Sequence, residues 1–288
     1  MFRTTLIAAT LSIAFAGAHA AQPLQVKVYN ADGNSFNVNS TLVYGEKEAM
    51  VIDAGFTRAD ALRIAANVLD SGKELKTIYV SQADPDYYFG VETIKEIFPT
   101  AEVVTTPAVL AKINAKLAGK IAFWGPKMGA NAPRTPVLPK AISGTTLTVD
   151  GQTVEIRGAT GALAHRPYAW IPSIKAVVGN IGVFGTNMHV WTADTQTVAE
   201  RSAWVAQLDE MAALQPAMVV PGHMPAGTAL NVTNVTYTKG YLQAFEKNAA
   251  AAKNSAELID AMKKAYPAAP MGLSLDIGAK VSKGEMKW

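Results

Sequence analysis

Two carboxylates, Asp84 and Asp86, stand two residues apart in a polar stretch that runs from Ser81 to Gly90. The apolar residues 77–80 before this stretch are typical of a short buried strand, and residues 91–98 after it predict an amphipathic helix. A loop between a strand and a helix can bring such carboxylates together on a cation or on a polar substrate. The loop is therefore the candidate site of the protein.

The same stretch resembles the metal-binding loop of the metallo-β-lactamase superfamily, which runs His-x-His-x-Asp-His-x-x-Gly after a strand. Asp86 and Gly90 match that pattern. Gln82, Asp84 and Tyr87 stand where the three histidines would be. The resemblance implies the frame of the superfamily's loop, with most of its zinc-binding chemistry replaced.

A second stretch, Val219 to His223, resembles the Pro-Gly-His at a strand end that gives the second metal of this superfamily its last ligand. A histidine that follows a glycine at a strand end is well placed for ligation. The superfamily's bridging carboxylate is expected in a Gly-Asp pair, but the chain has Gly179-Asn180 there. A neutral amide gives two adjacent cations little electrostatic support. The histidines beyond the N-terminal leader are also too few for a complete di-zinc site of this superfamily.

The resemblance then implies either one divalent ion or none. One ion can be bound by Asp84, Asp86 and His223, with Gln82 as a further ligand. This oxygen-rich shell suits Mn, Mg or Fe at least as well as Zn. Such an ion would lower the pKa of a water, and Asp86 would orient that water for attack on a carbonyl carbon. In the alternative, the two carboxylates bind loop amides, Tyr87 fills the space of the metal, and no metal binds.

Further side chains are candidates for contact with a substrate. The stretch 188–194 resembles one that lines the cleft in some exported members of the superfamily. Residues 165–170 either add a positive edge to that cleft or form a simple surface loop. The tryptophan at 124 either covers the cleft or pins its own segment to the core. The candidates for substrate contact are Tyr87, Asn180, His189, Trp191, His165 and Trp124.

The N-terminal residues 1–20 are typical of a secretory signal peptide, because Arg3 precedes an apolar core and Ala18-His19-Ala20 forms a cleavage site. We expect cleavage after Ala20 and a periplasmic or secreted protein. The chain has no cysteine, which excludes disulfides, thiolate ligands and a lipoprotein anchor. The net charge is +3 without a basic run, so no nucleic-acid partner is expected. No later segment is long and apolar enough for a membrane anchor.

The strands and helices that must position these residues follow from the sequence pattern, which predicts a mixed α/β (α+β) chain. Strands are expected at residues 25–29, 39–43, 48–52, 77–80, 102–106, 145–149, 153–157, 168–171, 175–178 and 218–220. Helices are expected at residues 57–72, 91–98, 107–117, 197–216, 237–251 and 255–265. Residues 118–143 are rich in glycine and proline, which predicts a long irregular segment of the kind that often forms a lid.

Strands followed by helices in each half match the four-layer αββα sandwich of the superfamily, a fold that the resemblance implies and periodicity alone does not. We expect one domain over residues 21–288, with a core at about 36–225 and a helical extension at about 232–288. The resemblance predicts an exported hydrolase that acts on an ester, lactone or amide through a reduced metal site. The alternative is a non-catalytic protein that uses the same cleft to bind a small ligand or a partner.

Overall fold

The computed structural model describes residues 22–288. The expected signal peptide and its cleavage position after Ala20 lie outside the described residues. None of the described helices is long and apolar enough to cross a membrane.

The first sheet has six strands in the order β1-β2-β3-β4-β5-β6. The strands β1 to β3 pair antiparallel, and from β3 onward each strand runs parallel to the next. The parallel steps pass through the helices α1, α3 and α4. The elements of this half are β1 (Gln25–Asn30), η1 (Gly33–Ser35), β2 (Asn39–Tyr44), β3 (Glu48–Ile52), α1 (Arg58–Ser71), β4 (Glu74–Tyr79), α2 (Pro85–Tyr88), α3 (Val91–Ile97), β5 (Glu102–Thr105), α4 (Pro107–Met128), η2 (Gly129–Asn131) and β6 (Lys140–Ala141).

The second sheet has five strands in the order β11-β10-β9-β8-β7. It is antiparallel from β7 to β10, and β11 joins it parallel to β10. The elements of this half are β7 (Thr146–Val149), β8 (Gln152–Arg157), η3 (Gly161–Leu163), β9 (Tyr168–Ile171), η4 (Pro172–Ile174), β10 (Ala176–Val178), α5 (Val198–Ala213), β11 (Met218–Val219), α6 (Thr233–Ala251), α7 (Ser255–Ala265) and α8 (Gly272–Ser282).

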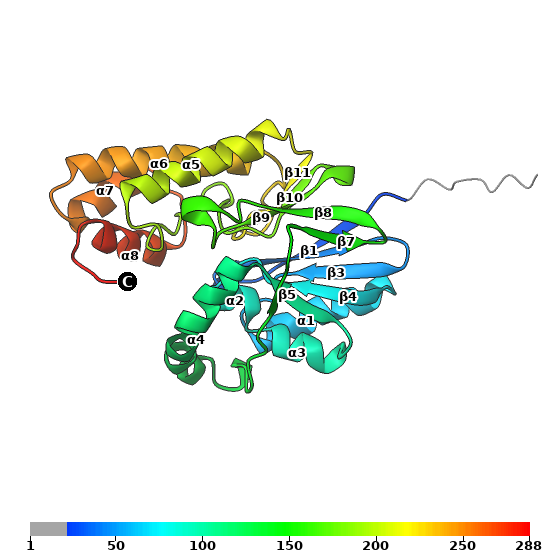
Figure 1. Ribbon diagram of the computed structural model, residues 1–288. Helices are drawn as coiled ribbons and strands as arrows, with labels where there is room; N and C mark the ends of the chain where they lie inside the picture. The colour runs from blue at the N-terminus through cyan, green and yellow to red at the C-terminus, as the bar shows by residue number, and fades with distance from the viewer. Residues whose placement is uncertain (1–21) are drawn as a thin grey trace, which may run out of the picture.

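The two sheets stack face to face, with α1, α3 and α4 outside the first sheet and α5 and α6 outside the second (Figure 1). Met50 and Ile52 of β3 share one buried cluster with Ile171 of β9 and Val178 of β10, and this cluster fills the space between the sheets. Burial of apolar surface on this scale is the main stabilising term of such a sandwich. The predicted αββα architecture is confirmed.

The helices α1 and α5 begin where the sequence predicts, and each begins with a capping box. The Thr57 hydroxyl accepts from the backbone N–H of Asp60, and the Asp60 carboxylate accepts from the N–H of Thr57. Thr197 and Glu200 form the same reciprocal pair at the start of α5. Each capping box satisfies backbone donors that the first helical turn leaves without partners.

The prediction of an irregular segment over residues 118–143 was wrong for its first part. The helix α4 continues through Gly119 to Met128, and Pro126 lies in its last turns. The apolar side chains at 109, 113, 117, 121 and 124 form one helical stripe that packs on the core cluster of the first sheet. A single glycine costs a helix only ~1 kcal/mol relative to alanine, so this stripe outweighs it.

Candidate functional site

The candidate site lies where loops from both sheets meet. The stretch from Ser81 follows β4, α2 carries Asp86, and His223 follows β11. The backbone of His223 bridges to Val38 on one side and to Phe184 on the other. These bridges hold the histidine between segments that belong to the two different sheets.

Asp86 and His223 face each other. The Oδ2 atom of Asp86 lies 3.5 Å from Nε2 of His223. The other ring nitrogen, Nδ1, lies 3.0 Å from the carbonyl oxygen of Phe36. A carbonyl oxygen only accepts, so Nδ1 carries the proton and Nε2 presents its lone pair to Asp86. The imidazole also stacks on the ring of Phe184, with centroids 5.3 Å apart.

The electrostatics keep this pair close to neutral. Burial lowers the pKa of His223 to about 4. Burial also raises the pKa of Asp86 above its usual range. Both shifts disfavour the charged form, which is what a site with little solvent does to ionisable groups. The pair is therefore an uncharged acceptor next to a carboxyl group that readily holds a proton.

The remaining expected metal ligands have other partners. The Asp84 carboxylate forms an ion pair with the amine of Lys120 at 3.5 Å. The Gln82 amide nitrogen donates to the Pro167 carbonyl oxygen at 3.0 Å. The Asn180 side chain accepts from the Val183 N–H and donates to the Val220 carbonyl oxygen, so both of its ends bind backbone.

Tyr87 takes up the space beside His223. The tyrosine is fully buried, and its ring stands on edge to the imidazole with centroids 5.8 Å apart. Its hydroxyl oxygen would lie only 2.5 Å from a Cβ added to Gly222, so it reaches the residue next to the histidine. Within residues 22–288, no group of three or more His, Asp or Glu side chains is placed to hold a metal ion. The donor set therefore does not fit a divalent metal centre.

A small polar cleft of about 40 Å³ lies beside Asp84. Its walls include the predicted residues Gln82, Asp84 and His165. Burial, with the nearby charges of Arg166 and Lys112, lowers the pKa of His165 to about 4. His165 is therefore a neutral side chain at ordinary pH.

The other walls of this cleft are Ala83, Lys112, Lys116, Arg166, Ile181 and Asp194. Arg166 and Asp194 lie in stretches that the sequence offered as possible linings of the cleft, and the other four were not predicted. Lys116 forms an ion pair with Asp194 at 3.7 Å. Residues 112, 116 and 120 share one face of α4, and their spacing of four is the sequence signal that could have pointed to them.

Asp194 is held by two indoles. Trp191 donates to one carboxylate oxygen at 2.6 Å, and Trp288 donates to the other at 3.1 Å. Burial alone would raise the Asp194 pKa, but the Trp191 bond and the nearby charges of Arg166, Lys116 and Lys120 hold it below its usual range. The C-terminal end of the chain thus returns to the side of the molecule where α4 lies (Figure 1). The predicted Trp191 therefore lies at the rim of the cleft and orients Asp194.

His189 and Trp124, two candidates for substrate contact, are not brought to this cleft. The Nδ1 atom of His189 lies 3.0 Å from the hydroxyl of Tyr241, a residue of α6, and the histidine is buried there. Trp124 packs edge-on against Phe36 and Phe56, with centroids 5.5 and 5.3 Å away. Trp124 therefore pins α4 to the core.

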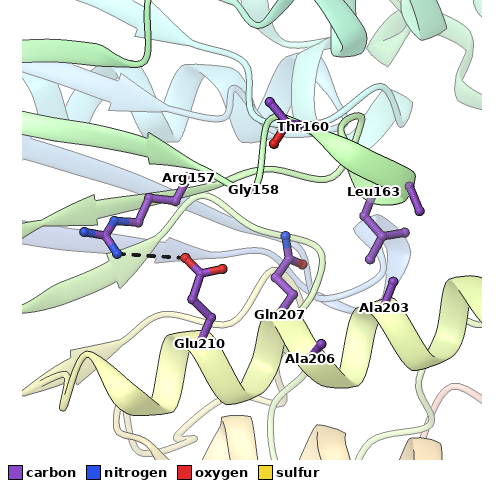
Figure 2. A pocket seen from close by; sticks show the side chains of 9 residues that line it. Arg157, Gly158, Thr160, Leu163, Ala203, Ala206, Gln207 and Glu210 are labelled. Atoms are coloured by element: carbon purple, nitrogen blue, oxygen red, sulfur yellow. Dashed lines mark ion pairs between the residues drawn. The ribbon is translucent and has the colours of Figure 1, made fainter.

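A larger groove of about 550 Å³ is lined by residues from Arg157 to Leu163 and by residues of α5 (Figure 2). It runs between Gly158 and the helix α5, and Arg157 forms an ion pair with Glu210 across it at 3.8 Å. The Gln207 amide nitrogen donates to the Arg166 carbonyl oxygen at 3.1 Å. The groove holds none of the expected site residues, so its chief relevance is that its wall supports the backbone of Arg166.

Residues 33–174 match the family model described as the metallo-beta-lactamase superfamily. No curated protein matches the chain. The structures to which the chain is similar include a metallo-beta-lactamase family protein from Thermus thermophilus, with 15% identity, a TM-score of 0.62, and coverage of 91% of this chain and 93% of that one.

Two further structures show the same fold. A beta-lactamase domain protein from Burkholderia ambifaria has 12% identity and a TM-score of 0.63, with 92% of this chain and 85% of that chain covered. A metallo-beta-lactamase from Pontibacter korlensis has 17% identity and a TM-score of 0.53, with 78% and 97% covered. At these identities the likeness concerns the fold, and function has to be argued from the site.

Proposed function

Because the chain belongs to the metallo-β-lactamase superfamily, whose fold is of a hydrolase type and whose members typically bind divalent metals, we propose that this member binds a small ligand in the same cleft without a metal. The observation that carries the proposal is the position of Tyr87, which stands where the superfamily's loop has its third histidine. Its phenol lies buried against His223 and reaches Gly222. A phenol in that place leaves Asp86 and His223 without a third ligand.

The charges around the cleft support the same proposal. A divalent ion is stabilised by carboxylates that have no other counter-charge. Here the amines of Lys120 and Lys116 lie 3.5 and 3.7 Å from the carboxylates of Asp84 and Asp194. Both carboxylates are thus neutralised by side chains, and further cations nearby would repel a metal ion. Such a cleft favours a ligand that exchanges hydrogen bonds and charges with fixed side chains.

The test of this proposal is the thermal unfolding of the protein with metals and with small organic compounds. We expect that a chelator, Zn, Mn, Fe and Mg leave the Tm unchanged, whereas at least one small organic compound raises it, because a ligand that binds only the folded state stabilises it. Lys112→Gln, at a residue that lines the cleft, should reduce that rise. A Tm increase with one metal that His223→Ala removes would contradict the proposal.

The second candidate function is hydrolysis of an ester, lactone or amide, with Asp86 as the group that acts on water. The observation that favours it is the approach of Asp86 to His223 at 3.5 Å, since these residues remain from the superfamily's ligand set. Turnover of a panel of esters, lactones and amides that Asp86→Ala abolishes would establish it. Turnover that survives in Asp86→Ala would exclude Asp86 as the acting group.

Export to the periplasm or beyond is part of the proposal. It is supported by the sequence of residues 1–20, with Arg3, an apolar core and Ala18-His19-Ala20. Sequencing the N-terminus of the protein recovered from a periplasmic fraction tests it. We expect the mature chain to begin at Ala21, and an uncleaved chain in the cytoplasm would contradict it.

A further inference from the structure

We infer that the small cleft beside Asp84 binds a monocarboxylate, whose charged group is held by Arg166 and Lys112. The inference names the ligand class of the site described above, so it rests on the proposed metal-free binding function. Three observations carry it: the size of the cleft, the unused hydrogen-bond donors of the buried Arg166 guanidinium, and the ion pairs formed by the lysines on α4.

The size of the cleft limits its occupant. Its volume is about 40 Å³. One water molecule needs about 10–15 Å³ of such space, so the cleft has room for a small polar group of a few atoms. Drug-sized ligands fill pockets of about 300 Å³ or more. The charged head of a small organic acid fits this space, and the rest of a small ligand would face the exposed side of α4.

Arg166 is a charged wall that has unused hydrogen-bond donors. The residue is only 4% exposed and lines the cleft. Its Nη2 donates weakly to the Ile181 carbonyl oxygen at 3.5 Å, and within residues 22–288 its Nη1 is buried with no hydrogen-bond partner. An unpaired buried donor on a charged group is costly, and a bound carboxylate supplies the missing acceptor.

The guanidinium is also fixed in place before any ligand binds. Its Cζ lies 4.2 Å from the centre of the Trp204 ring, which is a cation–π contact. The Arg166 backbone N–H donates to the Leu163 carbonyl oxygen at 2.7 Å, and its own carbonyl accepts from Gln207. A donor held this rigidly loses little entropy when an anion arrives.

The lysines of α4 divide into two roles. Lys116 and Lys120 pair with Asp194 and Asp84 respectively, so they neutralise the two carboxylates at the cleft. Lys112 lines the cleft and forms no ion pair or hydrogen bond through its side chain with any described residue. The two positive charges left for a ligand are therefore those of Lys112 and Arg166.

The charges and the size of the cleft favour a singly charged ligand. Asp84 and Asp194 line the cleft with Lys120 and Lys116 as their partners, so the charges left for a ligand come from Arg166 and Lys112. A carboxylate group can contact both of these cations with fewer atoms than phosphate, which the small volume of the cleft favours. A carboxylate also matches the planar fork of a guanidinium. The chemistry therefore favours a monocarboxylate over phosphate.

The experiment titrates the whole protein with sodium acetate and follows the Tm, with sodium chloride at equal ionic strength as the reference. We expect acetate to raise the Tm by about 3 °C at tenfold excess over its Kd, and sodium phosphate to raise it by less. Lys112→Gln should weaken acetate binding about tenfold. Lys127→Gln is the matched control on the same helix, because that amine contacts the Phe123 carbonyl and lies away from the cleft, and it should bind acetate normally.

Arg166→Lys provides the second variant, since it keeps the charge and loses the forked donor. We expect it to fold and to bind acetate at least threefold more weakly. Equal effects of acetate and chloride on the wild-type Tm, or unchanged acetate binding in Lys112→Gln, would overturn the inference. If neutral compounds raise the Tm and acetate does not, the ligand class is wrong while the proposed binding function stands. If metals raise the Tm, the proposed function itself fails.

Discussion

The ring of Tyr87 stands on edge against the imidazole of His223, with ring planes at 82° and centroids 5.8 Å apart. This contact connects the loop after β4 to the loop after β11. The tyrosine hydroxyl is buried and has no hydrogen-bond partner among residues 22–288. A large side chain with an unsatisfied polar atom therefore lies where the superfamily's pattern has a third imidazole, beside Asp86 and His223.

Replacing Tyr87 should restore part of the lost metal chemistry. Tyr87→His removes the phenol and adds an imidazole beside Asp86 and His223, which gives three ligands of the kind that hold zinc. We expect zinc to raise the Tm of this variant by several degrees although it leaves the wild type unchanged. Calorimetry should detect the same binding.

The neighbouring Tyr88 provides the control for this substitution. It is also buried with an unpaired hydroxyl, but it packs in the core cluster of the first sheet. Tyr88→His should cost stability, by about 1–3 kcal/mol, without any response to zinc. Zinc stabilisation of both variants, or of neither, would contradict the conclusion that Tyr87 fills the position of a third ligand beside His223.

Stability should fall as pH rises because of Asp53. This carboxyl is buried, and its burial raises its pKa to about 8 despite bonds from the Ser81 N–H and hydroxyl. The folded state therefore holds a proton that the unfolded chain, with a pKa near 4, has released. Stability from this group is complete below about pH 4 and is lost as pH rises toward 8, by up to ~1.4 kcal/mol per pH unit.

Asp53→Asn tests this linkage, because an amide does not titrate. Denaturant unfolding between pH 5 and pH 8.5 should show a smaller decline of stability with pH in the variant than in the wild type. Asp70→Asn, at an exposed carboxylate that pairs with Lys27, should retain the decline of the wild type. Parallel pH profiles of stability for Asp53→Asn and the wild type would refute the raised pKa of Asp53.

Gly222 should tolerate no side chain, because it lies between the two loops of the site. A Cβ there would meet the Asn180 carbonyl oxygen at 2.1 Å and the Tyr87 hydroxyl at 2.5 Å. We expect Gly222→Ala to destabilise the fold by about 2–4 kcal/mol in denaturant unfolding.

The control for this prediction is Gly119, which lies in α4 with nothing within 4 Å of an added Cβ. Gly119→Ala should stabilise the protein by about 0.5–1 kcal/mol, because alanine is the better helix former. An equal effect of the two substitutions would show that Tyr87 and Asn180 do not crowd Gly222.

The sequence predicted the frame of the site better than its walls. The strand-end loops that carry Asp86 and His223 were predicted because short motifs at strand ends are local features. The burial of Arg166 was not predicted, since it depends on Trp204 of α5, which is distant in the sequence. Residues 165–170 therefore fit a surface loop as well as a charged wall until the fold is known.

The helical faces were also predicted only in part. The sequence pattern predicts an apolar face of Leu62, Ala65, Val68 and Leu69 on α1. Ala65 and Val68 are buried, but Leu62 and Leu69 are 46% and 62% exposed, and Ile64 is buried instead. The buried face is the stripe of Ala61, Ile64, Ala65 and Val68, which has the i, i+3, i+4, i+7 spacing of one helix face. The extension of α4 was missed for a related reason, because glycine and proline weigh against a helix locally while packing decides the outcome.

The most direct measurement is the metal content of the protein purified from its native compartment without chelator, combined with the Tm after addition of Zn, Mn, Fe or Mg. The account predicts far less than one metal ion per chain and no change of Tm, because Asp86 and His223 lack a third ligand. About one ion per chain, lost in both Asp86→Ala and His223→Ala, would contradict it.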